Sequence, residues 1–390
     1  MTTQNVQKFY NQHPYPHYPL LATPRWQEGH LSSSRFARSL SGVQHSANSV
    51  CIIGCGEILP AIIRSWEPRS TTVHGVDLSK KSLIRAKFRC FRTTKKASFA
   101  CEDISHQTWN HKQEKWDHID AFGVLHHLEN PQQGFHTLYR SLNPGGTLRL
   151  MVYNNASRWW IHAIQAYFHQ EKLSPFSLKD INTAKKSLIQ LRESCQDFNN
   201  ITKNMGSIFH NNARFADTFM HPQETHLSIS QWHHLLRQYP LKIKGLFDRY
   251  CELDHLTNPL HTPPSLLQID KLAEEGFFHG NLEIYIQKEG VNTPKNTNTP
   301  FTTSSPPKNW FSHLETQDIP WRKKRQIWWD WYQNNQKTHN ISFKSKQRLA
   351  RIGAYHPQNE PHIHTPMCDT PRQYVRMSSK KQFYEQLAKL

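Results

Sequence analysis

The sequence predicts an α/β protein with a doubly wound, mostly parallel sheet of seven strands that ends in an antiparallel edge pair. Three observations predict this fold. Short apolar runs alternate with helical patterns over about residues 48–155, as expected for a parallel sheet covered by helices on both faces. The first of these runs ends in a glycine turn, and the next two end at or near an Asp. Two later apolar runs, at 241–249 and 282–287, can close the sheet as the edge pair.

The five parallel strands are expected at the apolar runs Val50–Ile53, Thr72–Asp77, Ser98–Cys101, His118–Gly123 and Thr147–Tyr153. Helical spacing of apolar residues predicts helices between them, at Leu59–Trp66, Ser79–Arg92 and Pro131–Leu142. The sequence Asn-Pro-Gly-Gly at 143–146 is typical of a turn, so we expect one before the fifth strand.

Composition divides the chain into four parts. Residues 1–47 are predicted to be an N-terminal arm or lid, and 48–290 the α/β domain, which contains a polar helical insertion at about 157–216. Residues 291–309 are rich in Pro, Thr and Asn, which predicts a linker. Residues 310–390 form a basic, Trp-rich C-terminal extension, in which 319–333 has a helical pattern.

Several classes of protein are disfavoured by composition. The 390 residues contain no apolar run of about 18, which argues against a membrane span, and the first residues lack the apolar core of a secretory signal. The seven cysteines are scattered without CxxC pairs, as in free thiols of a reducing compartment, so we expect a cytoplasmic protein without a metal site. No signal for an oligomeric state is present.

The glycine turn at 50–57, VCIIGCGE, is the first candidate for a ligand site. Ligands of open parallel sheets bind beyond the carboxyl ends of the strands, where Asp77 and Asp103 also lie in the predicted fold. A dinucleotide site would need a third glycine at Leu59, and Glu57 places a negative charge where a pyrophosphate would bind. These two differences argue against a nicotinamide dinucleotide.

Five ordered motifs resemble those of class I S-adenosylmethionine-dependent methyltransferases. They are VCIIGCGE, VHGVDLS, SFACEDI, WDHIDAFGVLHHLENP and LNPGGTLRLMVYN, and they cover about residues 48–155. The segment at 217–288 is similar more weakly, and FYNQHPYPHYP and DTFMHPQETHLSI resemble a bacterial subgroup of these enzymes. The resemblance implies a Rossmann-like methyltransferase domain with S-adenosylmethionine as cofactor.

The resemblance also implies roles for single residues at the carboxyl edge of the sheet. Gly54, Cys55 and Gly56, followed by Glu57, would let the backbone approach the methionine part of the cofactor. Asp77, followed by Leu78, would accept hydrogen bonds from the ribose hydroxyls, and Asp103 from the adenine amino group with Ile104 beside the ring. Gly123, Val124 and Leu125 would form the floor beneath the methyl donor.

Two positions depart from the family pattern. Ile52 stands where an acidic residue is usual, and Ile58 stands where a third glycine is usual, so a β-branched side chain could crowd the cofactor. A catalytically degenerate, cofactor-binding or scaffold protein is therefore one alternative.

The acceptor side offers fewer signals. His126 and Tyr153 are the candidate catalytic residues, because a His titrates near neutrality and Tyr153 ends the fifth strand. His221 and Glu224 are further polar candidates in the weakly matching segment.

The two ends of the chain leave alternatives open. The N-terminal arm is either an extended segment packed on the surface or a lid that brings Tyr10, Tyr15 or Tyr18 to the site. Residues 291–390 carry 16 Lys and Arg against 6 Asp and Glu. Their Trp residues either dock on the main domain or stack on the bases of an RNA. A small-molecule acceptor is the favoured prediction, and RNA methylation through the basic extension is the runner-up.

Overall fold

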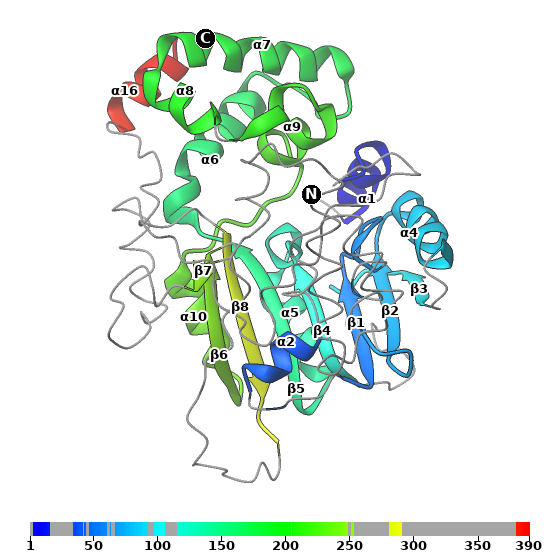
Figure 1. Cartoon of the computed structure of the whole chain (residues 1–390). Coiled ribbons are helices and arrows are strands. Elements are labelled where there is room, and N and C mark those ends of the chain that lie inside the picture. Colours follow the sequence, from blue (N-terminus) through cyan, green and yellow to red (C-terminus); the bar gives the residue numbers. More distant parts are fainter. Residues whose placement is uncertain are drawn as a thin grey trace, which may run out of the picture.

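The structure is a computed structural model of the whole chain. It describes residues 3–15, 34–41, 43, 47–60, 63, 67–92, 97–105, 115–203, 205–248, 251–252, 281–290 and 380–390. Within this part, a sheet lies under a layer of helices that covers one end of its strands (Figure 1). No helix of the described part is long and apolar enough to cross a membrane.

The sheet has the strand order β3-β2-β1-β4-β5-β8-β6-β7. Its strands are β1 (Ser49–Ile53), β2 (Thr72–Asp77), β3 (Ser98–Cys101), β4 (Trp116–Phe122), β5 (Leu142–Tyr153), β6 (Leu241–Asp248), β7 (Cys251–Glu252) and β8 (Asn281–Lys288). The first five pair in parallel, and β8 and β6 continue the sheet in antiparallel pairing. The predicted mostly parallel sheet with an antiparallel pair is confirmed, and the two-residue β7 adds to it. The strand order reverses between β1 and β4, which is where such sheets bind ligands.

The prediction of a turn at residues 143–146, before the fifth strand, is wrong, because these residues lie within β5. Helix α5 (Pro131–Arg140) ends two residues early, and Leu142 already pairs with Trp116 on β4. The register then shifts, because β5 takes five positions from Leu142 to Thr147 while β4 advances from Trp116 to His118. Gly145 has φ of +76° within this bulge. The Asn-Pro-Gly-Gly sequence therefore interrupts the ladder without ending the strand.

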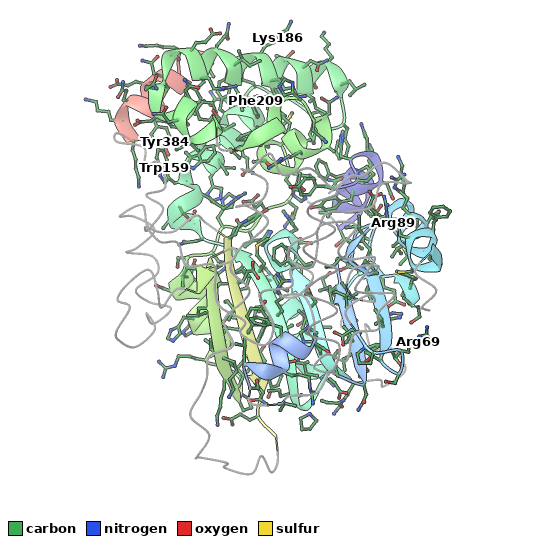
Figure 2. All side chains as sticks on the ribbon, in the orientation of Figure 1. Arg69, Arg89, Trp159, Lys186, Phe209 and Tyr384 are labelled. Atoms are coloured by element: carbon green, nitrogen blue, oxygen red, sulfur yellow. The ribbon has the colours of Figure 1, made fainter. Side chains whose placement is uncertain are left out.

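A helical layer sits over the carboxyl ends of the parallel strands (Figure 1). It consists of α6 (Asn155–Gln170), α7 (Leu178–Ser194), α8 (Gln196–Lys203) and α9 (Asn212–Phe219), which correspond to the predicted helical insertion. The layer has an apolar core of its own, and the C-terminal helix α16 (Lys380–Leu387) contributes Phe383 and Leu387 to it. Figure 2 shows Trp159 and Tyr384 side by side, with ring centroids 5.8 Å apart. The last helix of the C-terminal extension thus packs on the insertion.

Residues 3–12 at the start of the chain form a helix, and residues 16–33 of the predicted arm or lid lie outside the described part. Helix α1 (Thr3–Gln12) lies beside helix α4 (Lys80–Arg92) (Figure 1). Gln7 donates from Nε2 to the Leu78 carbonyl at 3.0 Å, and the Ser79 hydroxyl donates to Asn11 Oδ1 at 3.0 Å. These contacts hold α1 at the carboxyl end of β2. A second short helix, α2 (Ser34–Ser39), covers the face of β8 through Phe36 and Tyr285.

Several predictions fall outside the described residues. They concern most of the helix at Leu59–Trp66, Tyr18, the linker at 291–309 and the aromatic segment Ile319–Gln333. The remaining helices of the described part are η2 (Leu125–His127), η3 (Gly206–Phe209) and α10 (Ile229–Leu236).

A buried ion network crosses the middle of the sheet. Arg149 on β5 donates to Asp120 on β4 at 3.0 Å and to Glu283 on β8 at 2.8 Å. All three residues are at most 2% exposed. Because a buried charge is costly without a partner of opposite sign, this network links the parallel half of the sheet to its antiparallel half.

We predict that Arg149→Met lowers the free energy of unfolding by about 3–5 kcal/mol, because two carboxylates would lose the cation that lies between them. Urea denaturation at pH 7 measures this change. The control is Arg69→Ala, an exposed residue, for which we expect less than about 0.5 kcal/mol. A loss below about 1 kcal/mol for Arg149→Met would contradict the importance given to this network.

Candidate active site

A cavity of about 390 Å³ opens at the carboxyl edge of the sheet, between β1, β2, β4 and α1. It is lined by the ends of four parallel strands and the turns that follow them, by α1, by Asp217 of α9 and by Gln223. Ten of the predicted cofactor residues border it: Gly54, Cys55, Gly56, Glu57, Asp77, Leu78, Asp103, Ile104, Gly123 and Val124. Residues from four separate stretches of sequence are therefore brought to one site.

The glycine turn after β1 has a backbone that side chains disfavour. Gly54 and Gly56 have φ of +58° and +56°. A Cβ on Gly54 would lie 2.4 Å from Cγ2 of Val124, whereas a Cβ on Gly56 would meet nothing closer than 3.8 Å. Gly54 is thus needed for both its conformation and its close approach to the loop after β4. Gly56 leaves open space beside its backbone.

The two aspartates end neighbouring strands and hold the loops around the cavity. Asp77 accepts hydrogen bonds from the N–H groups of Gly56 at 2.8 Å and Ser79 at 2.7 Å. Burial raises the pKa of Asp77, although these N–H groups oppose the shift. Asp103 accepts the N–H and the hydroxyl of Ser105 through Oδ1, at 2.8 and 2.7 Å. Both carboxylates border the cavity and are fixed in place by local hydrogen bonds.

Glu57 lines the cavity, but its carboxylate is held by two arginines of α4. Arg85 and Arg89 both form ion pairs with it, the second at 3.4 Å. The negative charge of Glu57, which argued against a bound pyrophosphate, is therefore neutralised by Arg85 and Arg89. Leu125, predicted as part of the floor, does not border the cavity, because its side chain is 0% exposed in the main hydrophobic core.

The structure does not bring His126 or Tyr153 to the cavity. His126 is 1% exposed and its ring stacks on Tyr153 with centroids 3.6 Å apart. Neither ring nitrogen of His126 has a hydrogen-bond partner among the described residues. The guanidinium group of Arg158 also lies over the Tyr153 ring, with its central carbon 3.5 Å from the ring centroid. Burial lowers the pKa of His126 and raises that of Tyr153, so neither is suited to proton transfer at neutral pH.

The neighbouring His127 lines the cavity instead, together with Tyr10, Gln223 and Asp217. His127 Nδ1 lies 3.0 Å from the Gln223 carbonyl, and a carbonyl only accepts, so Nδ1 carries the proton. Tyr10 donates its hydroxyl hydrogen to Asp217 Oδ1 at 3.1 Å. Sequence reasoning missed Asp217 and His127 as site residues. The one available signal was that Asp217 begins the segment DTFMHPQETHLSI.

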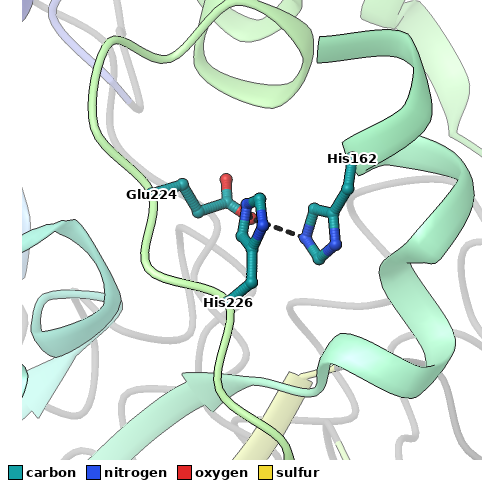
Figure 3. Close-up of side chains that lie close together, drawn as sticks. All are labelled: His162, Glu224 and His226. Carbon is teal, nitrogen blue, oxygen red and sulfur yellow. Dashed lines mark hydrogen bonds and ion pairs between the residues drawn. The ribbon is translucent and has the colours of Figure 1, made fainter. Parts of the chain in front are cut away.

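Glu224 anchors this segment to α6 (Figure 3). Arg158 donates to both of its oxygens at 3.1 and 3.3 Å, and His162 Nε2 lies 3.3 Å from Oε1. Burial alone would raise the pKa of Glu224, but Arg158 and His162 hold it well below its usual value. With His226, these residues place three possible metal ligands within 4.8 Å of one another, although the sequence predicted no metal site. Because Arg158 already neutralises the carboxylate, we interpret the cluster as an anchor.

A family model described as a methyltransferase domain matches residues 52–148. This match covers the glycine turn, both aspartates and the loop after β4 that surround the cavity. Over this segment the chain is similar to the class I S-adenosylmethionine-dependent methyltransferases.

Two curated relatives and one solved structure illustrate how far the similarity extends. An uncharacterized protein of Synechococcus sp. is 24% identical over 63% of this chain and 60% of its own length. The ubiquinone biosynthesis O-methyltransferase of Klebsiella pneumoniae is 24% identical over 33% of this chain and 52% of its own. The chain thus spans about half to three fifths of these relatives. The structure of PKMT2 from Rickettsia typhi has a TM-score of 0.53 at 14% identity, covering 72% of this chain and 57% of that one, and supports the fold.

The residues of the cavity fit S-adenosylmethionine. Two fixed carboxylates stand at the ends of β2 and β3, and the turn after β1 exposes backbone to the same space. Ile58, at the position of the usual third glycine, borders the cavity with 1% exposure and leaves its volume at about 390 Å³. Ile52 is buried inside β1 and packs in the core below the turn.

We predict that Gly54→Ala abolishes measurable cofactor binding, or weakens it at least about tenfold, because the new methyl group would displace Val124 and the turn. Titration calorimetry with S-adenosylhomocysteine measures this. Gly145→Ala is the matched control, since Gly145 has φ of +76° with nothing within 4 Å of its Cβ position. Equal effects of the two changes would show that backbone strain, and not the close approach, matters.

We also predict a pH-dependent effect of Asp217→Asn on stability. Burial raises the pKa of Asp217 to about 7, against an ordinary value of 3.8. The folded state therefore keeps a proton that the unfolded state releases, and stability falls as pH rises from about 4 to about 7. The Asn variant should gain up to roughly 4 kcal/mol over the wild type between pH 4 and pH 8, measured by urea denaturation. A constant difference across this range would contradict the raised pKa.

Proposed function

We propose that this protein transfers a methyl group from S-adenosylmethionine to a small-molecule acceptor inside the cavity. The observation that carries this proposal is the continuity of the cavity. Its lining includes a first group, Gly54, Asp77 and Asp103, and also Tyr10 and Asp217. A cofactor held by the first group has space beside it that polar side chains border.

In this proposal the chain mainly binds and orients its ligands. Asp77 would hold the ribose hydroxyls and Asp103 the adenine amino group, each with its carboxylate already fixed by backbone N–H groups. The cofactor supplies an activated methyl group on its sulfonium. In-line positioning of the acceptor then accounts for most of the catalysis, because correct orientation of two reactants is worth a large effective molarity.

A small acceptor agrees with the enclosure of the site by α1. The cavity is bordered by Thr3, Val6 and Tyr10 of this helix. Tyr15, which follows the end of the helix, borders it as well. The Klebsiella relative is named for ubiquinone biosynthesis, which is small-molecule chemistry. The RNA alternative rests on residues 310–390, of which the structure describes 380–390, and α16 there packs on the helical layer away from the cavity lining.

The test is calorimetric titration of the purified protein with S-adenosylmethionine and, separately, with S-adenosylhomocysteine. We expect micromolar binding of both. Asp77→Ala should weaken it by about 1.5–3 kcal/mol, the range for a hydrogen bond to a charged group. Glu193→Ala, an exposed change on α7, is the control and should leave the affinity unchanged. Absence of binding by well-folded wild-type protein would overturn the proposed function and favour a cofactor-free scaffold.

A further inference from the structure

The charged residues that line the cavity are all acidic. Among the described residues that border it, Glu57, Asp77, Glu102, Asp103, Glu129 and Asp217 are the charged ones, and no Lys or Arg is among them. The chain as a whole has a net charge of +18. The protein is positively charged overall, but its cavity is lined by acidic side chains. Such a lining favours ligands that are neutral or positively charged.

Asp217 is the acid that the helical layer contributes to the cavity, and Tyr10 holds it in place. It lies on α9, is 6% exposed and borders the cavity. Tyr10 donates to Oδ1 at 3.1 Å, and no second hydrogen-bond donor to Asp217 occurs among the described residues. Oδ2 therefore has acceptor capacity left for a group inside the cavity.

Tyr10 connects this acid to the cofactor side. Its backbone carbonyl accepts a hydrogen bond at 3.4 Å from the hydroxyl of Ser79, which lies two residues after Asp77. Its ring lies 6.3 Å from that of His127 and 5.5 Å from that of His221. Burial lowers the pKa of both histidines, so they are neutral rings at pH 7. Asp217 thus stands beside uncharged aromatic groups, which favour a cation, while Arg158 and Arg214 act on it from outside the cavity lining.

We infer that the methyl acceptor is an amine, and that Asp217, positioned by Tyr10, binds its ammonium form and takes its proton. This inference rests on the proposed function and names the acceptor class of the same site. It makes Asp217 a catalytic residue that sequence reasoning did not identify.

The proposed step balances as follows. The ammonium group gives one proton to the Asp217 carboxylate, and the neutral amine keeps its lone pair. That pair forms the N–C bond to the methyl carbon while the C–S bond breaks, and its electrons return to sulfur as a neutral thioether. Positive charge thus passes from sulfur to nitrogen, and Asp217 later releases its proton to water. A carboxyl whose pKa lies near 7 suits this exchange at neutral pH.

An oxygen acceptor fits these surroundings less well. A phenolate or carboxylate would bring a negative charge beside Asp217, with no Lys or Arg in the described lining to stabilise it. Methylation of an amine keeps the positive charge in the cavity throughout, where the acidic lining stabilises it.

The test compares two cofactor analogues, so it needs no known acceptor. Sinefungin carries an amine where S-adenosylmethionine carries its methyl group, and S-adenosylhomocysteine has nothing there. We expect calorimetry at pH 7.5 to show sinefungin binding the wild type about tenfold or more tightly than S-adenosylhomocysteine, as for a charge-assisted hydrogen bond. Asp217→Asn should bring the ratio of the two affinities to within about twofold.

Asp77→Asn is the matched control, because it should weaken both analogues by the same factor and leave their ratio unchanged. If S-adenosylhomocysteine does not bind the wild type, the proposed function itself fails. If it binds and the ratio in Asp217→Asn equals that in the wild type, the inference about Asp217 is overturned while the proposed function stands.

The pH profile of the wild type provides a second measurement if the Asn variant does not fold. The ratio should fall by about tenfold as pH drops from 8 to 6, because Asp217 becomes protonated while the amine stays charged. The titratable and charged groups that interact with Asp217 are Tyr10, Tyr153, Arg158, Arg214 and Glu224, and His127 and His221 lie beside the Tyr10 ring. None of the other shifted groups is expected to titrate between pH 6 and 8 in the same way. The pKa of Tyr10 is raised, and the pKa values of Glu224, His127 and His221 are lowered. A ratio that does not change with pH would overturn the inference.

Discussion

The site depends on the hydrogen bond from the Gly56 N–H to the Asp77 carboxylate. Parallel pairing of Ile53 with Val76 brings the ends of β1 and β2 together, and this bond then fixes the turn that follows β1. The turn is possible because Gly54 and Gly56 accept positive φ. A second hydrogen bond, from the Cys55 N–H to the Val76 carbonyl at 3.1 Å, also joins the turn to the end of β2.

Charge is distributed so that the cavity differs from the rest of the molecule. Arg85 and Arg89 neutralise Glu57 from the outer side, and Arg158 neutralises Glu224 in the layer above. None of these arginines borders the cavity. Of the carboxylates that do, Asp77 accepts from backbone N–H groups and Asp217 from the Tyr10 hydroxyl. Such an environment favours a positive sulfonium and a positive acceptor over anionic ligands.

Three parts of the chain complete the site over the sheet. The helical layer supplies Asp217 from α9, α1 supplies Tyr10, and the segment after α9 supplies Gln223. Glu224 fastens that segment to α6, and the N–H of Thr225 donates to the His126 carbonyl at 2.7 Å. The acceptor side is therefore built by packing between elements more than 200 residues apart, as the 207-residue separation of Tyr10 and Asp217 shows.

The sequence by itself determined the sheet and the cofactor side. Strand ends carry their own signals, because apolar runs followed by Gly or Asp mark where parallel strands meet the edge, and ten of the eleven predicted cofactor residues border the cavity. The sequence does not indicate which face of a short helix or of a strand end is buried. For this reason the predictions for Leu125, His126 and Tyr153 failed, because these side chains do not border the cavity. Asp217 and His127 were decided by tertiary structure alone, whereas the sequence had left open whether Tyr10 and Tyr15 reach the site, and both border the cavity. Their roles depend on how α1 and the helical layer pack on the sheet, and long-range packing leaves no periodic pattern in the residues that make it.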